Sequence, residues 1–219
     1  MTLGESGLAV HRYGERAFLV DCANSAVDDA LNWLAAIDAY DASRQLQSRP
    51  GASTVLVQFD PATTDADELE RALEQLAPIA YDQPTTQSVI YVPVVYDGDD
   101  LSDVASIAGL SAEEVIAAHT RATYTVAFVG FSPGFAYLRG LNPRLVVSRL
   151  ASPRQRVPPG AVAIADQWAG IYPRPSPGGW RLLGHTSLKV WDEQREGSAL
   201  LSPGTKVRFV DASSDAADA

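Results

Sequence analysis

The sequence predicts an α+β protein in which a two-layer α/β domain (residues 1–85) precedes a β-barrel domain (residues 86–211) with two leading helices. Three observations support this class. The chain has 219 residues, 46% of them hydrophobic, which suffices for two small domains with their own cores. Its first part mixes strand and helix periodicities. After residue 121, short strands alternate with loops rich in Pro and Gly. We expect the tail, residues 212–219, to be disordered.

The N-terminal domain is expected to contain three strands and two helices. Alternating apolar residues predict strands over 8–13, 16–21 and 53–59. Apolar residues at helical spacing predict one helix that begins after an N-cap at Asn24 or Ser25, and a second helix over 65–76. Because each helix has one apolar face, we expect both helices to cover the small sheet.

A polar run over 81–87 marks the expected domain boundary. Pro93 lies in the strand-like segment that follows, which favours a sheet edge or a bulge there. Two short helices come next. The first ends at Gly109, and a capping box from Ser111 to Glu114 opens the second. His119, near the last turn of the second helix, either caps that helix or serves as an acid, a base or an anion contact.

Short strands dominate the remainder of the chain. Residues 122–131 alternate between two faces, and further strand-like segments follow at 161–166, 170–173, 180–184, 187–191 and 206–210. Three Ser-Pro-Gly triplets stand at 132–134, 176–178 and 202–204. Proline holds φ at about −65° and glycine accepts a positive φ, so each triplet predicts a type II turn.

Charge is unevenly distributed along the chain. The formal net charge is −10, yet between residues 115 and 191 Asp166 is the only acidic residue, against nine Arg and Lys residues. This electropositive segment predicts either scattered solvated arginines or a site for a compact anionic ligand. Nucleic acid is an unsuitable partner, because the acidic half would repel it and no basic-aromatic motif occurs.

The sequence carries no pattern typical of metal binding, disulfide bonding, export or membrane insertion. Cys22 is the only cysteine, and the three histidines lack metal-ligand spacing. No long apolar run or signal-like segment occurs, so we expect a cytoplasmic protein without membrane contact. A Walker-type phosphate loop is also missing, which means that a partner chain would have to complete any ATP site.

The stretch GFSPGFAYL places Ser132 in the G-x-S-x-G spacing of a hydrolase nucleophile. That motif uses the backbone N–H of the next residue as an oxyanion donor, and Pro133 has none. Losing one such donor costs about 3–4 kcal/mol of transition-state stabilisation, so we reject this interpretation. The aromatic residues Phe131, Phe135 and Tyr137 are therefore either core residues at a barrel rim or the wall of a pocket.

Two further segments combine arginine with tight turns. Arg154 precedes a Pro-Pro-Gly turn, and Arg181 follows Gly178 and Gly179. Guanidinium groups suit carboxylates and phosphates, and adjacent glycines let backbone amides approach an anion. His185 lies at a strand–turn junction that is expected at the same rim.

The segments HTRATYTVAFVGFSPGFAYLRGLNPRL and SPRQRVPPGAVAIADQWAGIYPRPSPGGWRLLGHT closely resemble the B subunit of 5-oxoprolinase, in a group that includes KipI-type sporulation-kinase inhibitors and allophanate hydrolase subunit 1. The resemblance extends over essentially the whole chain. It implies that the barrel is cyclophilin-like. It also implies a homologous C subunit and an A subunit of the oxoprolinase complex as partners, in an assembly that uses ATP to open 5-oxoproline to glutamate. One departure is His185, which stands where the family has arginine and weakens an anion contact at neutral pH.

The resemblance also implies site residues. His119 and Arg154 would be catalytic, and Pro133 falls within the pocket-lining motifs. Together with Arg181 and His185, which the sequence itself suggests, the expected substrate-binding set is Phe131, Gly134, Phe135, Tyr137, Ser176, Gly178, Gly179, Trp180, Arg181 and His185.

Three functions follow from the group. The first is an enzyme component that is inactive alone and acts on a small anionic substrate once its partners are bound. The second is a regulatory module that inhibits a sensor histidine kinase, as KipI does. The third is the allophanate branch of urea degradation, which is also ATP-linked amide chemistry.

Overall fold

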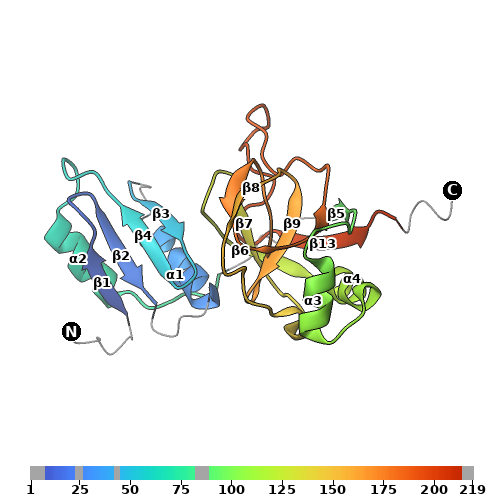
Figure 1. Ribbon diagram of the computed structural model, residues 1–219. Coiled ribbons are helices and arrows are strands. Elements are labelled where there is room, and N and C mark those ends of the chain that lie inside the picture. The colour runs from blue at the N-terminus through green and yellow to red at the C-terminus, as the bar shows by residue number, and fades with distance from the viewer. Residues whose placement is uncertain (1–7, 23–26, 42–44, 82–88, 214–219) are drawn as a thin grey trace. The chain divides into compact units, whose positions relative to one another are not determined.

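The computed structural model describes residues 8–22, 27–41, 45–81 and 89–213. The chain divides into two compact units, residues 1–85 and 86–219 (Figure 1). The α+β fold class, with an α/β layer followed by a barrel-like sheet, is confirmed. The expected N-cap at Asn24 or Ser25, nearly all of the polar run 81–87 and most of the expected disordered tail lie outside the described residues.

The first unit is an antiparallel sheet with two helices. The strands β1 (Ala9–Arg12), β2 (Ala17–Asp21), β3 (Gln47–Pro50) and β4 (Thr54–Gln58) take the order β1-β2-β4-β3. The helix α1 (Val27–Tyr40) contacts β3 and β4, and α2 (Ala66–Gln75) contacts β1. Sequence analysis missed β3, because QSRP contains no apolar alternation.

The core of this unit follows from the two periodicities. Val55 and Val57 on β4 are fully buried, as the alternation of a strand requires. Leu69 and Leu73 on α2 are buried one helical turn apart. Burying a side chain of this size contributes about 1.5–3 kcal/mol to stability. The apolar stripe formed by Leu69 and Leu73 therefore explains why α2 packs on the sheet. Asp65 caps α2 by accepting a hydrogen bond from the Glu68 amide at 3.0 Å.

The second unit is built on one seven-stranded sheet in the order β12-β9-β10-β7-β6-β13-β5. All neighbours are antiparallel except β13 and β5. Val95, just beyond β5, and His185 at the end of β12 exchange two backbone hydrogen bonds of 2.9 Å, which bring the two edges together. The elements are β5 (Ile90–Val94), α3 (Leu101–Ala108), α4 (Ala112–Arg121), β6 (Tyr124–Val129), β7 (Ala136–Arg139), η1 (Pro143–Leu145), β8 (Arg154–Val157), β9 (Ala161–Ala165), β10 (Trp168–Ile171), β11 (Ser176–Gly178), β12 (Arg181–His185) and β13 (Lys206–Asp211).

Strand β9, second in the sheet order, separates two cores. Val162 and Ile164 belong to the main barrel core, where α3 contacts β12 and α4 contacts β13. Its alanines at 161, 163 and 165 instead belong to a smaller cluster with aromatic residues beside the two-stranded sheet of β8 and β11. Small side chains on this face leave room for large rings, and the candidate site lies in that cluster.

Local signals in this unit were mostly reliable. Gly109 ends α3 with φ of 63°, and the Ser111–Glu114 capping box opens α4. Pro93 lies on β5, the last strand of the order, where a missing amide donor is tolerated. The expected strand over 187–191 is wrong. This segment is irregular apart from a bridge at Trp191, and it lines a cavity instead.

Two of the three expected Ser-Pro-Gly turns are confirmed. In 132–134 and 202–204 the glycine has φ of 82° and 88°, and a hydrogen bond of 3.0 Å runs from the following amide to the serine carbonyl. The triplet 176–178 is not a turn, because it forms β11 and pairs with β8. Pairing with β8 makes this triplet a strand, and three residues alone do not reveal which strand they will pair with.

Candidate functional site

An aromatic cavity of about 250 Å³ lies in the second unit, beside the small β8–β11 sheet. It is lined by Phe131, Phe135, Tyr137, Arg149, Pro153, Tyr172, Pro177, Gly178, Gly179 and Trp180. Six of the expected substrate-binding residues line it: Phe131, Phe135, Tyr137, Gly178, Gly179 and Trp180. Sequence analysis therefore identified most of the wall, although it left open whether these rings were core or pocket.

The rings hold one another in edge-to-face contact. Phe135 is 5.3 Å from Trp180 and 5.2 Å from Tyr172 between ring centroids, with interplanar angles of 82° and 74°. Tyr137 lies 5.5 Å from Trp180 at 74°. Such pairs contribute about 0.5–1.5 kcal/mol each beyond the area that they bury. These contacts hold the rings of the cavity wall in place relative to one another.

Glycine is required at one position of this wall. A Cβ on Gly178 would overlap the hydroxyl of Tyr172, so the β11 backbone can approach that ring only without a side chain. Gly134 does not line the cavity. Its φ of 82° and the nearby Trp191 side chain explain the glycine as part of a turn.

The two tyrosine hydroxyls of the cavity stay neutral. Burial raises the pKa of Tyr172, and a hydrogen bond with the Trp180 backbone opposes this only in part. Burial also raises the pKa of Tyr137, against the opposing charge of Arg149. Both side chains are thus protonated at neutral pH, and their O–H groups are available as donors.

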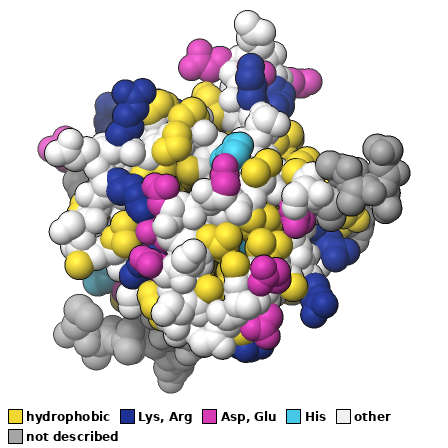
Figure 2. Space-filling model, turned by 45° about the vertical axis from the view of Figure 1, so that its right-hand side comes forward, with side chains coloured by type: hydrophobic (Ala, Val, Ile, Leu, Met, Phe, Trp, Pro, Cys, Tyr) yellow, Lys and Arg dark blue, Asp and Glu magenta, His cyan; other side chains and the backbone are white. Residues whose placement is uncertain are grey.

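Two arginines and one histidine expected at the site are instead paired with aspartates of segment 97–103. Arg154 Nη2 donates to both carboxylate oxygens of Asp100 at 2.8 Å. Arg181 pairs with Asp103 at 3.4 Å, and His185 Nδ1 lies 2.8 Å from Asp97. Acids that precede the electropositive segment in sequence therefore compensate two of its nine Arg and Lys residues. On the face shown in Figure 2, acidic and basic side chains are interspersed.

The ion pair of Arg154 supports the wall of the cavity. The buried Asp100 carboxylate also accepts a hydrogen bond from the Leu182 amide at 2.7 Å, and Arg154 Nη1 donates to the Trp180 carbonyl at 3.5 Å. This network joins the start of α3 to β8 and to the chain around Trp180. Arg154 does not line the cavity. Its geometry is that of a positioning residue.

Arg149 is the cation that sequence analysis missed. It lines the cavity, and it has no hydrogen bond or ion pair within the described part of the chain. Its charge reaches both tyrosine hydroxyls, because it opposes the rise of their pKa values. The sequence offers no signal that would separate Arg149 from Arg154 or Arg156, since only the fold decides which guanidinium meets an aspartate.

His119 lies apart from the cavity, which corrects the expectation that it shares a site with Tyr137, Arg154 and Trp180. Its side chain is fully buried and stacks on Phe209 with centroids 4.3 Å apart. Nδ1 lies 2.7 Å from the Tyr96 hydroxyl. Burial lowers its pKa to about 3, so the imidazole is neutral at pH 7. The physical reason is the apolar face of α4, which places His119 in the main core.

The remaining expected residues are accounted for by local structure. Pro133 occupies the turn before Phe135, and Ser176 belongs to β11 without lining the cavity. The Oγ atom of Ser132 is buried and has no hydrogen-bond partner among the described residues. No base therefore contacts this serine in the part of the chain that the structure describes.

Comparison with known proteins decides the family. Residues 8–201 match the carboxyltransferase domain, subdomain C and D. The chain belongs to this family. The B subunit of 5-oxoprolinase from Escherichia coli O157:H7 is 38% identical over 182 residues, which cover 81% of this chain and 83% of the relative. The expected resemblance to that group is thereby confirmed.

Solved structures agree with this carboxyltransferase-domain assignment. TTHA0988 is 38% identical with a TM-score of 0.76 over 90% of this chain, and this chain spans 40% of TTHA0988. The Kluyveromyces lactis urea amidolyase is 18% identical with a TM-score of 0.71, covering 96% of this chain and 15% of that protein. The second likeness shows a shared fold.

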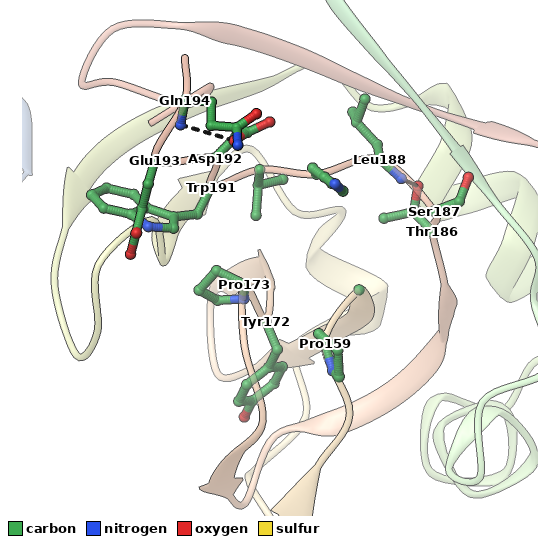
Figure 3. A pocket seen from close by; sticks show the side chains of 13 residues that line it. Pro159, Tyr172, Pro173, Thr186, Ser187, Leu188, Trp191, Asp192, Glu193 and Gln194 are labelled. Atoms are coloured by element: carbon green, nitrogen blue, oxygen red, sulfur yellow. Dashed lines mark hydrogen bonds between the residues drawn. The ribbon is translucent and has the colours of Figure 1, made fainter. Parts of the chain in front are cut away.

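A second, larger cavity of about 680 Å³ shares Tyr172 with the aromatic cavity. Figure 3 shows it between segment 186–194 and the loops that carry Pro159 and Pro173. Asp192 accepts a hydrogen bond from the Gln194 amide at 3.0 Å along its edge. Its lining combines Lys189 with two carboxylates, so it is less favourable for an anion than the aromatic cavity.

No described helix is long and apolar enough to span a bilayer.

Proposed function

We propose that this chain is the B subunit of an ATP-dependent 5-oxoprolinase-type complex and that its aromatic cavity holds the substrate. The observation that carries the proposal is the pairing of aromatic walls with one guanidinium, Arg149, that no described acid compensates, in a small cavity. The similarity to the B subunit of 5-oxoprolinase over most of the chain supports the same function.

The cavity suits a small ring that carries one carboxylate. At about 250 Å³ it is smaller than the roughly 300–1,000 Å³ of pockets for drug-sized ligands. The planar lactam of 5-oxoproline would lie against the rings of Phe135 and Trp180, with its carboxylate toward Arg149. The neutral hydroxyls of Tyr137 and Tyr172 are donors suited to the lactam oxygen.

The reaction needs more than this cavity supplies. A lactam carbon is a weak electrophile, and transfer of the terminal phosphoryl group of ATP to its oxygen makes it reactive. Water then adds to that carbon, the amine leaves as the ring opens, and a second water releases phosphate to give glutamate. We assign the nucleotide to the homologous C subunit and to the A subunit, which would complete the site. The greater length of TTHA0988 supports a further polypeptide segment beside this unit.

Reconstitution tests the proposal. The purified chain alone should release no glutamate from 5-oxoproline and ATP, whereas adding the C and A subunits from the same organism should restore release. Within that complex, Arg149→Ala should raise KM for 5-oxoproline at least tenfold, and Arg149→Lys should recover part of the loss. Arg144→Ala, on the neighbouring 3₁₀ helix, is the matched control. Turnover by the isolated chain, or an unchanged KM in Arg149→Ala, would contradict the proposal.

A further inference from the structure

Phe131 occupies a backbone conformation that large side chains rarely adopt. Its φ is 65°, and the Ser132 amide donates to the Gly130 carbonyl at 2.7 Å. A hydrogen bond between residues two apart with a positive φ at the centre is a γ-turn of the strained kind. For a bulky residue such a φ is an outlier, whereas glycine adopts it freely.

Burial of Phe131 is incomplete. The residue is 60% exposed, so more than half of its surface stays in contact with water. The chain uses glycine on both sides of this turn, at Gly130 and Gly134, yet keeps a large ring at the position where glycine would relieve the most strain. Backbone preference opposes this choice, and packing engages less than half of the surface of the residue.

The position of the ring supplies an explanation. Phe131 lines the aromatic cavity and meets Phe135 edge-on, with centroids 5.4 Å apart at 74°. It also lies 6.4 Å from Tyr172 at 86°. Phe131 is therefore the most exposed aromatic residue of a wall in which Phe135, Tyr172 and Trp180 are buried.

We propose that Phe131 is a specificity-determining residue that covers the ring of a planar carboxylate bound in the aromatic cavity. The strained turn holds the phenyl group at the mouth in advance, so that a ligand buries a surface that the free protein exposes. Strain of this kind persists where the surrounding structure enforces it, and it concentrates at ligand-binding sites. The ligand class follows from Arg149 and the aromatic walls, and so rests on the proposed function.

Three variants of the full chain test this: Phe131→Gly, Phe131→Ala and Phe131→Leu, with Val146→Ala as a control at another exposed apolar residue. Each is studied alone and with the C subunit bound. Urea unfolding gives stability without ligand, and calorimetric titration gives the affinity for 5-oxoproline and, separately, for benzoate. Phe131→Gly should be more stable than Phe131→Ala, because glycine relieves the positive φ. Both should bind the carboxylates at least tenfold more weakly than the parent chain, and Phe131→Leu should fall between.

The outcomes separate this proposal from the proposed function. Binding of benzoate but not 5-oxoproline, with the same dependence on Phe131, supports the role of Phe131 and contradicts the assigned substrate. Binding of 5-oxoproline with equal affinity in all variants contradicts the role of Phe131 and leaves the substrate intact. Variants that keep ligand affinity but lose the C subunit would identify Phe131 as a partner contact and overturn the proposal. A parent chain that binds neither carboxylate, whether alone or with its C-subunit partner, contradicts both.

Discussion

Protonation of His119 should make stability fall steeply as the pH is lowered. The imidazole is fully buried, and its pKa is lowered from 6.5 to about 3 by burial. Its neighbours are the hydroxyls of Tyr96, at 2.7 Å from Nδ1, and Tyr124, which donates to the His119 carbonyl. Asp211 is close enough to raise the pKa of Tyr96, the second cause of that shift after burial. None of these groups offers the imidazolium a direct carboxylate partner.

The sign of the effect follows from proton binding. Below pH 6.5 the unfolded chain takes up a proton on His119 that the folded chain does not bind, so the free energy of unfolding decreases as the pH falls. The contribution is complete above pH 6.5 and is lost progressively down to about pH 3. Each pH unit within this window corresponds to about 1.4 kcal/mol, so lowering the pH from 6.5 to 4.5 should remove about 2–3 kcal/mol.

The assay is urea unfolding of the second unit at several pH values, followed by tryptophan fluorescence. His119→Leu should lower stability at neutral pH, because the Tyr96 hydroxyl loses its partner, but it should flatten the slope below pH 6.5. Val115→Ala, at another fully buried position on α4, should lower stability without changing the slope. Equal slopes in the parent chain and in His119→Leu would refute the reasoning.

Three further predictions concern the supports of the site and of α4. Asp100→Ala leaves Arg154 without its carboxylate partner and the Leu182 amide without its acceptor. We expect urea unfolding to show a loss of about 2–4 kcal/mol in the free energy of unfolding. The loss should be smaller than for a fully buried ion pair, because Arg154 is partly exposed. Asp103→Ala, which removes only an exposed partner of Arg181, should stay within about 1 kcal/mol of the parent and serves as its control. Gly178→Ala should force the β11 backbone away from Tyr172, at a cost of about 1–3 kcal/mol in the free energy of unfolding. The variant should also bind the ligand more weakly, as measured by calorimetry. A fully retained affinity would show that this contact does not shape the cavity. Ser111→Ala should lower the thermal stability of the second unit by about 1 kcal/mol, and an unchanged midpoint would mean that Glu114 alone caps α4.

Elements with strong local signals could be predicted from the sequence. Three examples are the apolar stripe of α2, the capping box of α4 and the apolar alternation of β4. In each, a few neighbouring residues are enough to predict the element. By contrast, β3, β8 and β11 are short and contain polar residues, proline or glycine. They are strands because a neighbour completes their hydrogen bonds, and long-range pairing of this kind leaves no local periodicity.

The aromatic wall was predictable in composition but not in shape. Phe135 and Tyr137 stand two residues apart, which puts both on one face of the chain that enters β7. Tyr172, in contrast, was overlooked, because a tyrosine in a strand is ordinary until the fold opposes it to Gly178. The same holds for Phe131. Its residue type was noticed, but the positive φ that makes the choice unusual exists only in the folded chain.

The charged side chains show most clearly why residue type alone is not enough to assign a residue to a site. Arg154, Arg181 and His185 lie 54, 78 and 88 residues from their acidic partners, so a charge count over a sequence window overlooks acids that offset part of that charge in the folded chain. All three partners are aspartates of segment 97–103. Arg149 is the one cationic residue that lines the aromatic cavity in the described part of the chain, and one guanidinium between aromatic walls suits a single carboxylate on an apolar ring. The proposed selectivity for one carboxylate therefore depends on Arg149 and the aromatic rings around it.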